Sequence, residues 1–187
     1  MNDSLQTKHG RIELVLGNIV EQAVDAIVNA ANTKLAGGGG VDGAVHRAAG
    51  PRLKEECLLL PADESGRRCP TGEVRVTSAG NLPAHWVIHA VGPFYNERYA
   101  DKARQQLRQV YQKALEAATA QGCRSVALPA ISTGAYRFPL ADAAPIALEV
   151  AMEHLQRQQS VELVRFVLFK PAHLEVFRAA LQALSGE

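Results

Sequence analysis

The sequence predicts a layered α/β domain, and three observations lead to this prediction. Short apolar runs typical of strands alternate along the chain with apolar stripes at helical spacing. Two of the expected strands run into loops of glycine and small polar residues, the position at which open α/β sheets place ligand-binding groups. The chain has 187 residues, 47% of them hydrophobic, which is enough for one domain with a substantial core.

The individual elements follow from this alternation and from the residues that interrupt it. Residues 1–10 are expected to form a flexible N-terminal tail and residues 11–185 a single domain. Pro145 suits a helix only in its first turn, so the helix around it is expected to start near Asp142. Residues 61–72, rich in Pro, Gly and charge, read as a surface loop. Strands are expected over residues 12–16, 26–28, 73–78, 86–91, 125–130 and 164–169, and helices over residues 41–49, 51–60, 107–118, 142–155 and 174–184.

Four consecutive glycines, residues 37–40, stand between a buried strand and a helix. Such a run is costly in chain entropy, so it indicates positive φ angles or close approach of the backbone to a ligand. Glycine N–H groups that lead into a helix N-terminus favour an anion, and a phosphate is expected over residues 38–41. The formal G-x-G-x-x-G match lacks the context of a dinucleotide-binding fold, and no Lys follows Gly40 as a Walker loop requires.

A second loop, residues 131–139, follows the same logic. Its sequence, ISTGAYRFP, begins where a buried strand ends. Hydroxyl and backbone donors from Ser, Thr and Gly suit phosphate oxygens, and two aromatic residues stand beside them.

Charge and cysteine usage exclude several classes of function. Lys and Arg number 20 against 19 Asp and Glu, without a basic block, so extended nucleic-acid binding is disfavoured. The cysteines Cys57, Cys69 and Cys123 form no CxxC pair, which indicates a reducing compartment and neither a disulfide framework nor a zinc site. The six histidines are scattered and show no arrangement typical of metal ligands, so no metal is expected. The polar N-terminus and the lack of a long apolar window predict a cytoplasmic protein without a membrane segment.

The two loop sequences identify a family. NAANTKLAGGGGVDGAVHRAAG and PAISTGAYRFP, together with LGNI at the end of the first strand, resemble the macrodomain family in its MacroD-type branch, and the similarity runs from about residue 12 to residue 181. The resemblance implies a three-layer α/β/α sandwich around a mixed, mostly parallel six-stranded sheet. Members of this branch remove ADP-ribose from acidic side chains of mono-ADP-ribosylated proteins and deacetylate O-acetyl-ADP-ribose, with no metal and no cofactor.

The resemblance also assigns residues to parts of ADP-ribose. Gly40 and Val41 meet the diphosphate from one side, and Ser132, Thr133, Gly134 and Ala135 meet it from the other. Asn32 binds hydroxyls of the distal ribose, Tyr136 lies next to that ribose, and Asp42 orients or deprotonates the attacking water. Asn32 and Asp42 are therefore the expected catalytic residues.

The adenine end is assigned to residues that follow the first and last strands. Asn18 and Ile19 belong to the adenine site, and Phe169 is expected to stack on the ring. The family usually has aspartate at the position of Asn18. A neutral amide gives up the charge-assisted part of the hydrogen bond from the adenine amino group.

Alternative interpretations remain at three residues and for the function as a whole. Asp42 could cap the helix that follows the glycines, Asn29 could satisfy backbone at a strand end, and Phe169 could belong to the core. A reader module that binds ADP-ribose without cleaving it is the alternative function, and an RNA-binding accessory is a third. Retention of both Asn32 and Asp42 favours the enzyme.

Overall fold

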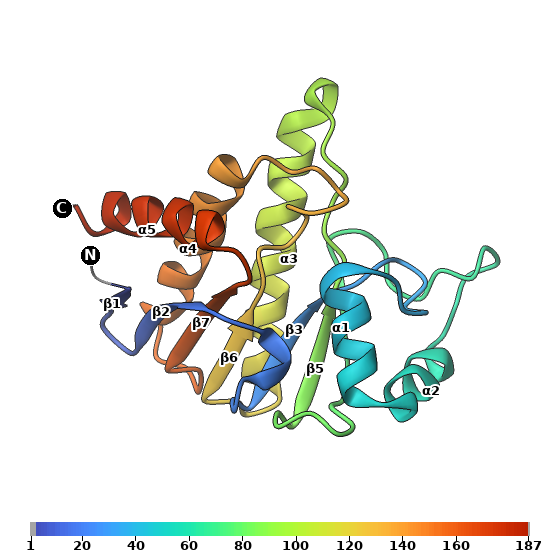
Figure 1. Cartoon of the computed structure of the whole chain (residues 1–187). Coiled ribbons are helices and arrows are strands. Elements are labelled where there is room, and N and C mark those ends of the chain that lie inside the picture. Colours follow the sequence, from blue (N-terminus) through green and yellow to red (C-terminus); the bar gives the residue numbers. More distant parts are fainter. Residues whose placement is uncertain (1–2, 187) are drawn as a thin grey trace.

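In a computed structural model, which describes residues 3–186, one mixed sheet of seven strands lies between two layers of helices (Figure 1). Five strands are parallel, and the outermost strand on each side pairs antiparallel with its neighbour. The strands in spatial order are β1 (Ser4–Gln6), β2 (Arg11–Leu16), β7 (Leu163–Leu168), β6 (Ser125–Leu128), β3 (Ala26–Ala30), β5 (Trp86–Ala90) and β4 (Val74–Ser78).

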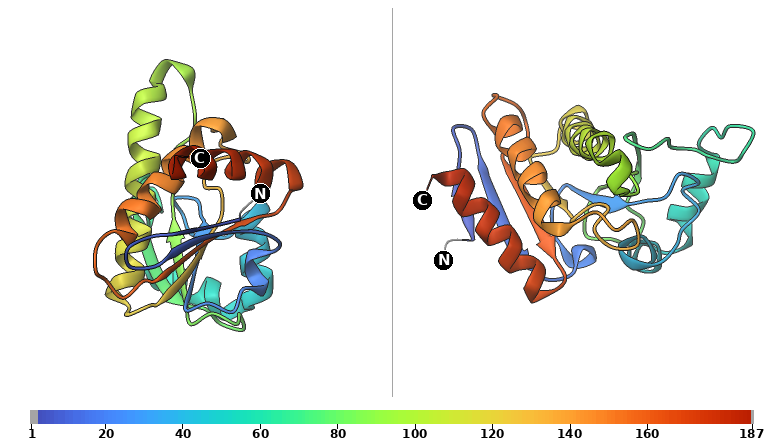
Figure 2. Two further views of the ribbon diagram at one scale, coloured as in Figure 1. Left: turned by 90° about the vertical axis from the view of Figure 1, so that its left-hand side faces the viewer. Right: turned by 90° about the horizontal axis from the view of Figure 1, so that it is seen from above.

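Alternation along the strands divides the core between the two faces of the sheet. Ala26 and Val28 of β3 face one cluster of buried residues, and Ile27 between them faces another. The first cluster packs against α3 (Ala100–Ala120), α4 (Leu140–Leu155) and α5 (Pro171–Ser185). The second packs against α1 (Gly40–Ala49) and α2 (Pro51–Leu59). The left view of Figure 2 shows the sheet between α3 and α4 on one side and α1 and α2 on the other. The predicted three-layer sandwich is confirmed.

The parallel register brings five strand ends to one edge of the sheet. Leu16 of β2 lies opposite Leu168 of β7, and Ala30 of β3 lies opposite Ala90 of β5. The loops that follow these strands therefore emerge side by side. The loop after β2 contains a short 3₁₀ turn at Ile19–Glu21, and the loop after β5 contains one at Glu97–Tyr99. This edge is where an open parallel sheet positions a ligand.

Three details differ from the sequence-based expectation. The sheet has seven strands instead of six, and the additional strand, β1, falls in the stretch predicted as a flexible tail. Leu5 is the one side chain of this short strand that packs against the core, a pattern too brief to identify a strand. Residues 1 and 2 lie outside the described part. Helix α4 begins at Leu140, so Pro145 lies inside it and not in a first turn that starts near Asp142.

Candidate active site

Asp42 is the carboxylate around which the site is arranged. It lies in the first turn of α1 and is only 6% exposed. Its Oδ1 accepts a hydrogen bond from Asn29 Nδ2 at 2.8 Å and lies 3.4 Å from Nε2 of His46, one helical turn further on. Its Oδ2 is buried and has no hydrogen-bond partner among the described residues. One carboxylate oxygen is therefore fixed and the other is available for chemistry.

Asn32 borders the same space from the loop after β3. A β-carbon placed on Gly38 would lie 3.2 Å from Asp42 Oδ2 and 3.5 Å from Asn32 Nδ2, so both side chains meet above this glycine. Asn32 Nδ2 donates to Gly37 O at 3.0 Å, and its Oδ1 accepts from Lys34 N at 3.2 Å. The amide is thus oriented by its own loop and keeps one N–H and one lone pair for a ligand.

The N-terminus of α1 provides an anion-binding surface next to Asp42. Gly38, Gly39 and Gly40 are exposed, Val41 is half-buried, and no side chain caps the helix at Gly39. Gly40 has φ +56°, and a β-carbon there would meet no atom within 4 Å. The uncapped N–H groups and the helix dipole favour a negative group over this turn. The capping role considered for Asp42 is not observed, because the cap position is Gly39 and the helix has no side-chain cap.

The second loop, residues 131–139, follows β6 and is anchored at its start by Tyr111 of α3. Tyr111 of α3 donates its hydroxyl to Pro129 O at 3.0 Å and accepts from Ile131 N at 2.9 Å. Ser132 is buried with φ +67°, and its Oγ has no partner in the described part of the chain. Thr133 Oγ1 donates to Ala130 O at 2.8 Å, so this hydroxyl shapes the turn and retains only acceptor capacity. Gly134 and Ala135 are exposed at the tip.

An aromatic pair closes one side of the site. Tyr136 stacks on Phe94, which follows β5, with ring centroids 3.8 Å apart. Burial and, to a smaller extent, the charge of Asp42 raise the pKa of Tyr136. Phe94 is 69% exposed and was not predicted as a site residue. The sequence shows an aromatic residue a few positions after an expected strand, but nothing in it pairs Phe94 with Tyr136.

The residues assigned to adenine lie at the other end of this edge. Gly17 N donates to Leu168 O at 2.9 Å, which joins the loop of Asn18 to the strand end that carries Phe169. Phe169 is 75% exposed, so it is not a core residue. Asn18 Oδ1 accepts from Val20 N at 3.2 Å and caps the short turn in which Ile19 is buried. The structure therefore groups the residues predicted for the ribose and diphosphate, and places those for adenine beside them on the same sheet edge.

Several buried polar atoms near Asp42 lack partners within residues 3–186. They belong to side chains from β3, from α1 and from the second loop, and buried polar groups of this kind are normally hydrogen-bonded. The atoms are Asn29 Oδ1, Asp42 Oδ2, both ring nitrogens of His46 and Ser132 Oγ. Asp42 Oδ2 and Ser132 Oγ belong to the loop edge of the sheet and are the unpartnered atoms open to a polar ligand, whereas Asn29 is 0% exposed within the sheet.

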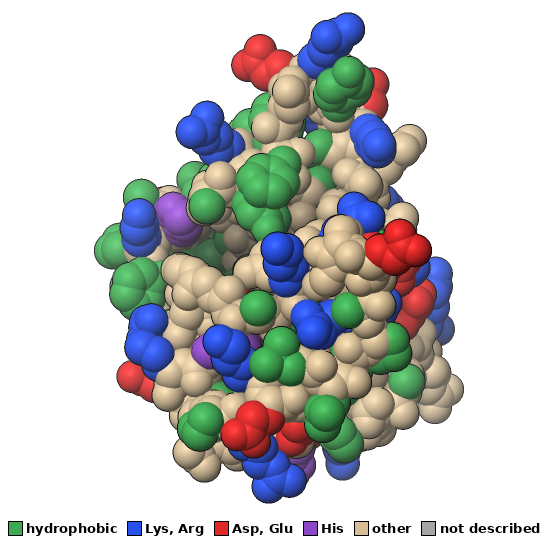
Figure 3. Space-filling view, turned by 90° about the vertical axis from the view of Figure 1, so that its right-hand side faces the viewer, with side chains coloured by type: hydrophobic (Ala, Val, Ile, Leu, Met, Phe, Trp, Pro, Cys, Tyr) green, Lys and Arg blue, Asp and Glu red, His purple; other side chains and the backbone are tan. Residues whose placement is uncertain are grey.

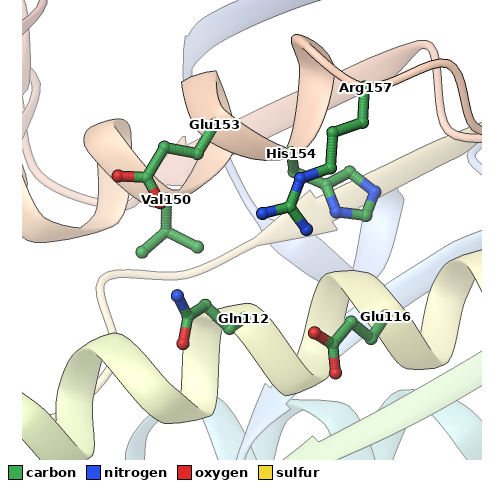
Figure 4. Close-up of a pocket in the computed structure, with 6 residues that line it drawn as sticks. All are labelled: Gln112, Glu116, Val150, Glu153, His154 and Arg157. Carbon is green, nitrogen blue, oxygen red and sulfur yellow. The ribbon is translucent and has the colours of Figure 1, made fainter.

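Other features of the surface do not compete with this site. A groove with a volume of about 130 Å³ lies between α3 and α4, away from the strand ends (Figure 4). It is lined by Gln112, Glu116, Val150, Glu153, His154 and Arg157. On the face that carries α1 and α2, Lys and Arg side chains lie scattered among uncharged surface (Figure 3). Among residues 3–186, no three His, Cys, Asp or Glu side chains are arranged to hold a metal ion, and no helix is long and apolar enough to cross a bilayer.

Comparison with known proteins identifies relatives over nearly the whole chain. A family model described as Macro domain matches residues 28–147. A macro domain-containing protein of Vibrio parahaemolyticus is 51% identical over 171 residues, which cover 91% of this chain and 96% of that protein. An O-acetyl-ADP-ribose deacetylase of Escherichia fergusonii is 44% identical over 177 residues, which cover 95% and 98% of the two chains.

Solved structures of macrodomains also resemble this chain. The Oceanobacillus iheyensis macrodomain with ADP superposes with a TM-score of 0.92 at 38% identity, over 98% of this chain and 96% of that one. The Trypanosoma brucei macrodomain in complex with ADP-ribose superposes with a TM-score of 0.81 at 37% identity, over 91% of this chain and 68% of that one.

Proposed function

Because the chain belongs to the macrodomain family, we propose that it is a hydrolase of ADP-ribose esters. Its substrates are acyl-linked ADP-ribose on Glu and Asp side chains of mono-ADP-ribosylated proteins, and O-acetyl-ADP-ribose. One observation carries the proposal. The buried Asp42 has one oxygen anchored by Asn29 and the other unpartnered beside the uncapped N-terminus of α1.

The two loops are proposed to clamp the diphosphate. Backbone N–H groups of Gly40 and Val41, at the positive end of α1, face it from one side. The turn of residues 132–135 faces it from the other and contributes the unpartnered hydroxyl of Ser132. Neither side needs a metal ion to neutralise the charge, because backbone dipoles and the helix N-terminus serve that purpose.

The distal ribose is proposed to lie between Asn32 and the Phe94–Tyr136 stack. The free N–H and lone pair of Asn32 match a vicinal diol, which both accepts and donates. At the opposite end, the exposed ring of Phe169 offers a stacking surface for adenine worth about 1–3 kcal/mol. Asn18 and Ile19 complete that end of the binding site.

Asp42 is proposed to act on water with its unpartnered Oδ2. Where the ester oxygen is on the anomeric carbon, the water oxygen forms a bond either to that carbon, breaking its bond to the ester oxygen, or to the ester carbonyl carbon, breaking the acyl bond; an acetyl ester on another ribose hydroxyl is cleaved only by the second route. In each case Asp42 accepts the water proton and passes it to the departing oxygen, and the products are ADP-ribose and a carboxylic acid. General-base assistance of this kind contributes about 10²–10⁴ in rate.

The test is a time course of ADP-ribose release in the presence of a chelator, from O-acetyl-ADP-ribose and from a protein modified on Glu or Asp. Asp42→Ala is expected to lower turnover by about 10²–10⁴-fold while the Kd for ADP-ribose stays within about threefold. Asp101→Asn is the matched control, because Asp101 is an exposed carboxylate on α3. Reaction of the protein-linked substrate in ¹⁸O-labelled water locates the attack from the acid product: label in the acid indicates the carbonyl, and an unlabelled acid indicates the anomeric carbon.

Two outcomes would contradict the proposal. A folded protein that binds ADP-ribose but releases none from either substrate is a reader module. An active protein in which Asp42→Ala turns over at the unsubstituted rate has its catalytic base elsewhere.

A further inference from the structure

His89 is a fully buried titratable residue directly beneath the site, and the mechanism above does not use it. It lies on β5 opposite Asn29 of β3, and both side chains are 0% exposed. Asn29 in turn contacts Asp42, and His89 contacts Thr77 on the edge strand β4. A continuous row of polar side chains therefore runs through the sheet from its edge to the carboxylate.

The direction of each hydrogen bond in this row follows from the donors available. Thr77 donates its hydroxyl to Ser78 O at 3.0 Å, so its oxygen accepts from His89 Nε2 at 2.9 Å. With the proton on Nε2, the other ring nitrogen, Nδ1, accepts from Asn29 Nδ2 at 3.2 Å. The second N–H of that amide group goes to Asp42 Oδ1.

The other neutral tautomer, with the proton on Nδ1, gives an unfavourable contact in either orientation of the Asn29 amide. A proton on Nδ1 would face the NH₂ group of Asn29, placing donor against donor. Rotating the amide to accept from Nδ1 would bring its oxygen to 2.8 Å from a carboxylate oxygen of Asp42, placing acceptor against acceptor. Only the Nε2–H tautomer, with the amide nitrogen of Asn29 between the imidazole and the carboxylate, gives every contact of the row a donor and an acceptor, while Asn29 Oδ1 stays without a partner among the described residues.

The surroundings keep the imidazole neutral. Burial, with a smaller contribution from nearby His46, lowers the pKa of His89 to about 3. Cys57 Sγ lies 3.6 Å from His89 Nε2, and burial raises the pKa of this thiol to about 11, so it contributes no charge. Both uncharged forms persist across the physiological pH range.

We propose that His89 is a positioning residue for hydrolysis, which it serves through Asn29. The Nε2-protonated imidazole prevents the Asn29 amide from flipping, and the amide holds Asp42 Oδ1 so that Oδ2 points into the space above Gly38. This inference rests on the proposed function, in which Asp42 activates the attacking water. His89 itself touches no substrate.

The first test separates turnover from binding. His89→Leu leaves an N–H of Asn29 without an acceptor and is expected to lower kcat by about 10–100-fold, the range found when a partner that orients a metal ligand in the same way is removed. KM and the Kd for ADP-ribose should stay within about twofold. His89→Gln, which supplies both an acceptor and a donor, should recover most of kcat. A folded His89→Leu variant with unchanged kcat overturns the proposal.

A double-mutant cycle tests whether His89 acts through Asn29. In an Asn29→Ala background, His89→Leu should lower kcat by less than about twofold, because the route to Asp42 is already interrupted. A full additional loss in that background overturns the positioning role. If His89→Leu does not fold, Thr77→Val removes the acceptor for Nε2–H with little change in shape. Thr77→Ser is its control and should retain kcat.

A spectroscopic readout distinguishes failure of this inference from failure of the proposed function. Two-bond ¹H–¹⁵N correlation on the unsubstituted protein is expected to show His89 as the neutral Nε2–H tautomer from pH 5 to pH 8. An Nδ1-protonated or charged ring in an active protein overturns the positioning role alone. Absence of turnover in the unsubstituted protein refutes the proposed function, and with it the catalytic consequence of the network.

Discussion

Gly92 is the position where two loops of the site approach most closely, and its substitution tests the geometry directly. It follows β5 and faces the second loop, residues 131–139, at the end of β6. A β-carbon on Gly92 would lie 2.1 Å from Ser132 Oγ and 2.5 Å from Ile131 Cγ2. Neither neighbour can yield easily, because Ser132 is buried with a positive φ and Ile131 is a buried, β-branched residue.

Gly92→Ala is therefore expected to destabilise the fold and weaken binding together. Overpacking of this kind costs about 1–3 kcal/mol, which corresponds to a decrease in Tm of roughly 3–10 °C for a domain of this size. Displacement of Ser132 should remove about one charge-assisted hydrogen bond to the diphosphate, and so about tenfold in ADP-ribose affinity.

The measurements are thermal unfolding followed by circular dichroism and titration calorimetry with ADP-ribose. Gly17→Ala is the matched control, because a β-carbon there would make only ordinary contacts, at 3.8 Å. Its Tm and affinity should not change. Unchanged Tm and affinity in Gly92→Ala would refute the reasoning, because the two loops would then not be in contact as the structure has them.

Three further predictions concern the glycine turn, the adenine end and the pH dependence of stability. Gly40→Glu should abolish ADP-ribose binding in calorimetry by placing a charged side chain over the proposed diphosphate site; the position opens to free space but its φ of +56° strains an L side chain, so thermal unfolding checks first that the variant is folded; retained affinity would contradict the placement. Asn18→Asp should tighten ADP-ribose binding by about 1 kcal/mol, or roughly fivefold, through a charge-assisted bond to the adenine amino group, and equal or weaker binding would contradict it. His89 has a folded-state pKa of about 3, below its ordinary value of 6.5, so the unfolded state binds a proton that the folded state excludes. The stabilisation from His89 should thus be fully present only above pH 6.5. The free energy of unfolding, measured with urea, should fall by roughly 2–3 kcal/mol between pH 6.5 and 4.5 because of this group. The decrease should be smaller in His89→Gln, and equal decreases in both proteins would contradict the prediction.

The fold and the backbone parts of the site could be predicted from the sequence because their signals are local. Apolar alternation predicted the strands that form the parallel sheet, and the glycine run at residues 37–40 predicted a turn that leads into a helix. The edge strand β1 could not be predicted, because three residues with one core contact carry no periodicity. The stacking partner Phe94 was missed although its position after a strand was visible, since a single exposed aromatic has no meaning until the neighbouring loop is placed.

The polar row through the sheet could not be predicted for a different reason. Asn29 and His89 stand in apolar strands, where a satisfied core side chain is the natural interpretation of each, and sequence offers no way to pair them. Tyr111 reads as one member of a helical apolar stripe, yet its hydroxyl fixes the second loop. The parallel register of β3 and β5 is what places Asn29 opposite His89, and register is a property of the folded sheet.

Substitutions in the loops and in the strands of this site are expected to have different effects. Loops at the sheet edge carry the groups proposed to bind ADP-ribose, but the carboxylate proposed to act on water is oriented from inside the sheet, through Asn29. Substitutions in the loops should therefore change affinity first, whereas substitutions in β3, β4 and β5 should change turnover with little effect on affinity. On the proposed function, binding and hydrolysis depend on separate parts of one fold, so a single buried substitution would turn the proposed hydrolase into a reader whose ligand-binding surface is intact.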